Sequence, residues 1–192
     1  DSSEDPIFKR EEEFRVNTYY QGSQGSPSIA KLSDGGFLVT WQSRGRHGSI
    51  RNIYGQRYDQ YGRSIGSEFQ INSNTSSDYH RVAPSSTGLS DGGFVVTWSK
   101  QERGQIDPGS ISGTSGSIYG QRYDSSGTPI GPEFIVGNSV DNPTEMQSVA
   151  RLANGGFVVT WLSRSDITNG QVVYGQIYDK NADPIGKEFP MY

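Results

Sequence analysis

Three oxygen-bearing side chains stand at alternate positions near the end of the chain, in Asp179-Lys-Asn181-Ala-Asp183. Carboxylate and amide oxygens at this spacing are typical of calcium-binding loops. The same residues also suit a plain turn, in which an aspartate side chain accepts backbone N–H groups. The equivalent segments after Asp59 and Asp124 lack the extra oxygen ligands. The pattern therefore predicts either a calcium site at Asp179, Asn181 and Asp183 or a turn capped by Asp179, and calcium is the one cofactor to expect.

Aromatic and basic side chains that interrupt an otherwise repeated pattern are the candidate ligand-binding residues. Tyr61 has no aromatic counterpart in the equivalent turns, where Ser126 and Asn181 stand. Residues 44–51 carry three arginines, which could bind sulfate, uronate or another acidic group through charge-assisted hydrogen bonds, or could form a solvated loop. The expected ligand-binding residues are Tyr61, Tyr79, His80, Arg81, Arg44, Arg46 and Arg51.

Catalytic groups are not visible in the repeated motifs. Glutamate recurs in near-identical context at Glu13, Glu68, Glu133 and Glu188. An enzyme builds one site from different residues, so this repetition favours bonding to a neighbouring strand or turn. The chain has two histidines, in unlike positions, and no cysteine, so no nucleophile–base pair can be assembled. The sequence predicts a protein that is not an enzyme.

Three motifs recur three times in a fixed order, which means that one supersecondary unit was triplicated. The first motif is Gly-Gly-Phe-(Val/Leu)-Val-Thr-Trp, the second is Tyr-Gly-Gln-(Arg/Ile)-Tyr-Asp and the third is Ile-Gly-x-Glu-Phe. The first begins at Gly35, Gly92 and Gly155, the second at Tyr54, Tyr119 and Tyr174, and the third at Ile65, Ile130 and Ile185. Repetition of this kind decides the architecture and serves mainly the fold.

Each unit is predicted to be a four-stranded antiparallel meander. In the first unit the expected strands are residues 28–32, 37–43, 52–59 and 68–72, separated by turn signals rich in glycine and aspartate. The units span about 13–72, 73–137 and 138–192, after a polar segment at 1–12. Residues 13–17 match residues 68–72, so the chain opens with the last strand of a unit whose other strands are missing.

Alternation along the second strand predicts that sheets stack on sheets. Phe37, Val39 and Trp41 share one face, and the other face is mixed but also contains a residue suited to burial. We therefore expect an all-β fold of β-propeller-like blades. The alternative is a β-prism, in which three sheets close around a three-fold axis. A propeller needs about four or more blades, so this interpretation also predicts a homo-oligomer or further repeats of a longer protein.

The amino-acid composition argues against several classes of partner and of chemistry. The net charge of −4 disfavours nucleic acid, and no segment approaches the roughly 20 apolar residues that span a bilayer. The absence of cysteine excludes disulfides and thiolate chemistry. Asp1 in place of methionine suggests a processed or trimmed chain.

The motifs at Gly92–Trp98, Ile118–Asp124 and Gly131–Val136 resemble a repeat of large secreted bacterial proteins, including RTX-type calcium-binding proteins and adhesins. The resemblance covers about residues 13–192, although the Gly-Gly-x-Gly-x-Asp array of the calcium β-roll is absent. It implies a secreted protein with a surface or matrix role, often with calcium and sometimes with carbohydrate binding. The expected function is non-enzymatic, lectin-like adhesion to glycan or matrix. A structural module of an extracellular complex is the alternative, and a polysaccharide hydrolase ranks last.

Overall fold

The computed structural model describes most of the chain after its first residues. The described residues are 13–46, 48–73, 75–102, 116–136, 145–164 and 170–191, so the polar segment 1–12 lies outside them. They form twelve strands. No helix long and apolar enough to cross a membrane occurs within these ranges.

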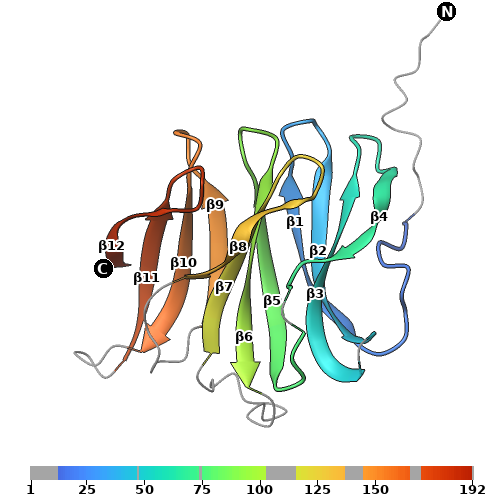
Figure 1. Ribbon diagram of the computed structural model, residues 1–192, viewed down its shortest axis with the longest axis horizontal. Coiled ribbons are helices and arrows are strands. Elements are labelled where there is room, and N and C mark those ends of the chain that lie inside the picture. The colour runs from blue at the N-terminus through green and yellow to red at the C-terminus, as the bar shows by residue number, and fades with distance from the viewer. Residues whose placement is uncertain are drawn as a thin grey trace, which may run out of the picture.

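The strands form three four-stranded antiparallel sheets, each in sequential order (Figure 1). Sheet A contains β1 (Gln24–Lys31), β2 (Phe37–Gly45), β3 (Gly48–Tyr58) and β4 (Ser64–Gln70). Sheet B contains β5 (Tyr79–Gly88), β6 (Phe94–Glu102), β7 (Gly116–Tyr123) and β8 (Pro129–Val136). Sheet C contains β9 (Glu145–Arg151), β10 (Phe157–Arg164), β11 (Gln171–Tyr178) and β12 (Pro184–Met191). The predicted all-β fold and its three antiparallel meanders are confirmed.

Strand β4 is longer at its start than the sequence indicated. It begins at Ser64, four residues before the predicted strand 68–72, and contains Gly66 at a φ of +69°. The pairing of β3 with β4 shifts register at this point, and the Gln56 side-chain amide donates to the carbonyls of Ile65 and Gly66 over 3.2 and 3.3 Å. Glycine here marks a bulge inside a strand, whereas the sequence analysis left residues 64–67 outside its predicted strands.

The three sheets stack face to face in the order A, B, C, with sheet B in the middle (Figure 1). Between sheets A and B, Leu38 and Ile53 pack with Trp98, among other residues of one buried cluster. Between sheets B and C, Ile118 packs with Trp161 in a second cluster. The aromatic strand face of each later unit thus meets the aliphatic face of the unit before it, as the alternation predicted.

The three sheets do not close on one another. Ile53 and Ile118 are fully buried, but the equivalent Val173 in sheet C is 40% exposed. The outer face of sheet A is covered instead by the segment that precedes β1, whose Val16 packs against the cluster formed by Val39, Trp41, Tyr54 and Tyr58. A closed three-fold β-prism is therefore not formed.

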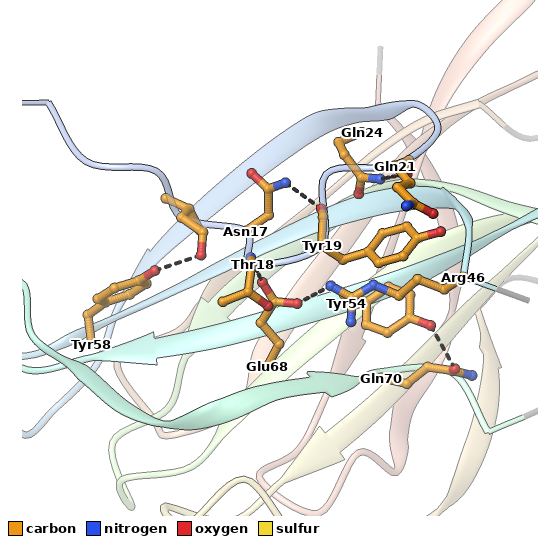
Figure 2. Close-up of polar contacts among 11 residues, drawn as sticks. Asn17, Thr18, Tyr19, Gln21, Gln24, Arg46, Tyr54, Tyr58, Glu68 and Gln70 are labelled. Atoms are coloured by element: carbon orange, nitrogen blue, oxygen red, sulfur yellow. Dashed lines mark hydrogen bonds and ion pairs between the residues drawn. The ribbon is translucent and has the colours of Figure 1, made fainter.

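Residues 13–17 lie on sheet A although they form no strand. The Tyr58 hydroxyl donates to the Val16 carbonyl over 3.1 Å (Figure 2). The Phe14 ring lies 5.5 Å from the Tyr58 ring. In the next unit the Tyr123 hydroxyl donates to the Ile71 carbonyl over 2.6 Å. The segment therefore takes the place of the strand end that a preceding unit would supply, although the strand that its sequence match predicted is not formed. The sheet that Phe14 and Val16 require is supplied by their own chain.

Candidate functional site

The first strands of the three sheets, β1, β5 and β9, lie next to one another. Each contains one non-glycine residue in the left-handed region: Ser26 at a φ of 49°, Ala83 at 51° and Met146 at 55°. The pairing of each first strand with its neighbour shifts register around this residue. A bulge of this kind bends a strand and redirects its side chains, and such backbone strain collects at ligand sites.

Serine side chains join the first strands to one another. The Ser28 hydroxyl accepts the backbone N–H of Ser86 over 3.2 Å, and the Ser85 hydroxyl accepts that of Val149 over the same distance. Ser28 and Ser85 occupy equivalent positions, since they pair with Thr40 and Thr97. The first strands are therefore fixed by repeated side chain–backbone hydrogen bonds that connect one sheet to the next.

A groove of about 640 Å³ opens over the ends of these strands. Its polar lining consists of hydroxyl groups and two cations, on Ser33, Ser86, Thr87, Lys31 and Arg151. Both cations are exposed, and none of the described residues that line the groove carries a carboxylate. The volume lies within the ~300–1,000 Å³ usual for small-molecule sites. The lining can donate hydrogen bonds to a hydroxylated ligand and can pair with an anionic group.

Two further grooves, of about 500 and 560 Å³, lie at equivalent positions beside the last strands of sheets C and A, β12 and β4. One is lined by Glu188 and the other by Glu68. Glu68 accepts the backbone N–H of Thr18 and pairs with Arg46 (Figure 2). Glu133 accepts both the N–H and the hydroxyl of Ser73 in the same way. Glu68 and Glu133 thus bond to a neighbouring segment of the chain, which confirms for these two the structural role inferred from their repetition.

The structure places the predicted ligand-binding residues on sheets A and B, with Tyr61 apart from the others. Arg44 and Arg51 are cross-strand partners on β2 and β3, and the Arg51 N–H donates to His80 Nδ1 over 3.1 Å. Tyr61 lies in the turn between β3 and β4, at the opposite end of β3, where its ring is 4.9 Å from the Arg63 guanidinium. Tyr61 therefore does not share a site with the arginines.

Arg46 and Tyr79 take part in two similar stacks, which share the equivalent rings of Tyr54 and Tyr119. The Arg46 guanidinium lies between the rings of Tyr19 and Tyr54, 4.8 and 4.2 Å from their centroids (Figure 2). In sheet B, the Lys100 ammonium lies 4.1 Å from the Tyr79 ring and 5.0 Å from the Tyr119 ring.

Arg81 is only 1% exposed and donates to the carbonyls of Ser76 and Tyr79. Desolvation lowers the pKa of its guanidinium. The contacts of Arg46, Tyr79 and Arg81 serve packing, and ligand binding by the seven predicted residues stays a prediction.

Asp179 caps its turn by accepting backbone N–H groups, which is the geometry of the turn interpretation given above. Its Oδ1 accepts the N–H groups of Asn181 and Asp183 over 2.8 and 2.9 Å, and these hydrogen bonds lower the pKa of the carboxyl group. Asp59 and Asp124 make the same pair of bonds in their own turns. Among the described residues, no cluster of three or more histidines or carboxylates could hold a metal. Calcium at Asp179, Asn181 and Asp183 stays a prediction.

Sequence reasoning missed Lys31 and Arg151, the two cations of the groove. They occupy equivalent positions at the ends of β1 and β9, and Gly88 stands at that position in β5. The residues around them repeat, so this position interrupts the pattern as Tyr61 does. A search for residues that interrupt the repeat would therefore have identified the position of Lys31 and Arg151.

No family model and no curated protein matches the sequence. Solved structures do match in fold. A Hadza microbial sialidase aligns with a TM-score of 0.61 at 10% identity over 84% of this chain and 36% of its own. An endo-arabinase from Bacteroides thetaiotaomicron VPI-5482 aligns with a TM-score of 0.53 at 14% identity, over 91% of this chain and 66% of its own. An alpha-L-arabinofuranosidase from Lactobacillus brevis aligns with a TM-score of 0.53 at 14% identity, over 87% of this chain and 53% of its own.

The chain therefore spans between about a third and two thirds of the length of these structures. All three are named as enzymes, and this likeness contradicts the expected non-enzymatic, lectin-like function. The prediction of a non-enzymatic function was wrong because it was drawn from the repeated residues. Those residues form the fold, and they carry no information about residues outside the repeat. The resemblance to RTX-type and adhesin repeats, and secretion, stay predictions.

Proposed function

We propose that this protein acts on polysaccharide in the manner of a glycoside hydrolase, with the sugar chain bound in the groove over β1, β5 and β9. The groove supplies binding, and the carboxylate pair that cleaves a glycosidic bond comes from outside its described lining. The three sheets then serve as successive blades of a β-propeller. The observation that carries the proposal is the fold likeness, with TM-scores above 0.5 to a sialidase, an arabinase and an arabinofuranosidase over at least 84% of this chain.

The groove supports this proposal by its position and its chemistry. It lies where the first strands of three units meet, so residues of different units contribute to one site. Sugars present hydroxyl groups to be bound, and Ser33, Ser86 and Thr87 offer hydroxyl partners there. The bulges at Ser26, Ala83 and Met146 lie on the same strands, and bulges of this kind are frequent beside active sites.

The charges of the groove favour an acidic sugar as ligand. Lys31 and Arg151 both line it, and no described carboxylate lines it to neutralise them. A uronate, a sialic acid carboxylate or a sulfate ester would form charge-assisted hydrogen bonds with these cations. This local charge is opposite in sign to the net charge of −4 of the whole chain.

The test compares binding and cleavage of acidic and neutral polysaccharides. Affinity electrophoresis in gels that contain polygalacturonate or neutral arabinan measures retardation, and a reducing-sugar assay measures cleavage. We expect stronger retardation by the acidic polymer, and loss of most of it in Lys31→Ser and Arg151→Ser. Lys180→Ser, in an exposed turn of sheet C, is the matched control and should behave as the unmodified chain.

Equal retardation of all variants would remove the groove as the binding site. Absence of both retardation and cleavage over a wide panel of polysaccharides would refute the proposed function. Retardation without cleavage would restrict the protein to binding and would contradict the enzymatic part.

A further inference from the structure

One face of sheet C is open where the same face of the other sheets is covered. Val173 is 40% exposed, whereas its equivalents Ile53 and Ile118 are fully buried. Met191 is 44% exposed, whereas Ile71 and Val136 at the same position are 3% and 2% exposed. These side chains form an apolar surface, here called the open face, which also includes Phe189 at 37% exposure.

The other two sheets show what chemistry covers this face. Against sheet A, the Phe69 ring packs 6.4 Å from Phe94 and 6.0 Å from Tyr123 of sheet B. The Tyr123 hydroxyl also donates to the Ile71 carbonyl in this buried contact, and desolvation raises the pKa of that hydroxyl. Against sheet B, the Phe134 ring packs 6.1 Å from Phe157 and 5.4 Å from Tyr178 of sheet C. Two successive contacts therefore use equivalent residues at similar ring distances.

The opposite end of the stack is closed by a different means. The face of sheet A that would meet a preceding unit carries Val39 and Trp41, which are 8% and 4% exposed. Phe14 and Val16 supply the ring contact and the carbonyl acceptor for Tyr58. Residues 13–20, here called the cap, thus imitate the strand end of a preceding unit, in a manner similar to the terminal capping repeats of stacked proteins. No equivalent cover lies on the open face within the described residues.

We propose that the open face binds a further sheet of this same repeat, which offers an uncapped Phe-x-Val-x-Trp face. Its phenylalanine and tyrosine pack on Phe189, and its aliphatic side chains pack on Val173 and Met191. The tyrosine hydroxyl donates to the Met191 carbonyl, the position that corresponds to the Ile71 carbonyl. A second intact copy of this chain does not meet the requirement, because its cap already covers the only face of this kind that sheet A presents. This inference is independent of the proposed function.

The experiment uses a copy of the full chain with a loosened cap as the probe. In Phe14→Asp/Val16→Asp, two carboxylates replace the apolar side chains that hold the cap on sheet A. The probe also carries Met191→Glu, which blocks its own open face, because probes with both faces available would associate head to tail. We expect this probe to form a one-to-one complex with the intact chain, measured by sedimentation velocity, whereas the intact chain alone stays monomeric. The substitution Met191→Glu in the intact chain should weaken the complex at least 10-fold.

Ile185→Glu supplies the matched control in the same strand. Ile185 is 51% exposed, and its equivalents Ile65 and Ile130 are 38% and 42% exposed although their sheets are covered. This position therefore lies outside the contact, and Ile185→Glu should bind the probe as the unmodified chain does.

Far-UV circular dichroism first establishes that each probe is folded. If this variant is unfolded, Thr18→Pro in place of the two cap substitutions provides a milder probe, because it removes the N–H that Glu68 accepts and leaves the apolar residues in place. A folded probe that does not bind the intact chain would overturn the proposal. So would a complex that Met191→Glu leaves unchanged, or self-association of the intact chain as strong as its binding to the probe.

Discussion

Truncation of Trp98 tests the packing between sheets most directly. Trp98 is 1% exposed, packs in the cluster between sheets A and B, and stacks on Tyr119 at a centroid distance of 6.5 Å. An aromatic side chain of this size buries ~200 Å², and at ~25 cal/mol per Å² its transfer from water contributes about 5 kcal/mol. Large-to-small changes of this type cost about 3–5 kcal/mol in other proteins. We therefore expect Trp98→Ala to lower the free energy of unfolding by roughly 3–5 kcal/mol.

Urea denaturation followed by the fluorescence of Trp41 and Trp161 measures this loss. With a slope of about 2 kcal/mol per M, the midpoint should fall by roughly 2 M. Met146→Ala is the control, since Met146 is 72% exposed and its truncation should change the stability by less than about 0.5 kcal/mol. A loss below about 1 kcal/mol for Trp98→Ala would show that the tryptophan is not enclosed between the sheets and would refute the packing described above.

Three further changes test other parts of the structure. Gly120→Ala should cost roughly 1–3 kcal/mol in a urea titration, because a Cβ there would lie within 3 Å of three Phe134 ring atoms, whereas Gly25→Ala, with 3.6 Å to its nearest neighbour, should be tolerated. Hydrogen bonds from the Ser126 hydroxyl and the Thr128 N–H lower the pKa of the Asp124 carboxyl group. Its contribution to stability is therefore present above pH ~4 and is lost as the pH falls below that value. In Asp124→Asn the acid-induced fall of the melting temperature should be smaller. Calcium, predicted at Asp179, should raise the melting temperature only slightly, because Oδ1 already accepts two N–H groups, and identical melts in calcium and in EDTA would remove the metal.

The strands and faces were predictable because their signals are local. Alternation of Phe94, Val96 and Trp98 identifies a strand with one strongly apolar face, and these three residues are 0%, 0% and 1% exposed. The match of residues 13–17 to residues 68–72 predicted a strand that is not formed, but the matched residues Phe14 and Val16 do contact sheet A. Both inferences require only the period of a strand and the comparison of one unit with the next.

The rest depends on contacts between units, which no single unit encodes. The bulges at Ser26, Ala83 and Met146 occur at residues of unlike type, so no shared turn residue marks them. The groove brings Lys31 of the first unit to the same site as Arg151 of the third, and this meeting follows from the stacking of the sheets. A site assembled from several units leaves no motif in any one of them, so the repeated motifs gave no signal of the enzymatic function proposed above.

The near-identity of the three hairpins has a consequence for how the chain reaches its native state. The central strand pairs use the same register, with Phe37 opposite Tyr58, Phe94 opposite Tyr123 and Phe157 opposite Tyr178. A strand of one unit could therefore pair with the partner strand of another, a misfolding route characteristic of repeat proteins.

The length of the connecting loop should determine how fast each of the three central hairpins forms. Only residues 46 and 47 separate β2 from β3 along the chain, while residues 103–115 and 165–170 separate the corresponding strands of the later units. Short loops lose less entropy on closure, so the first hairpin should form first and the second last. The unit in the middle of the stack, which both neighbours need, would thus be the slowest to nucleate, and mispaired species should accumulate mainly through its strands.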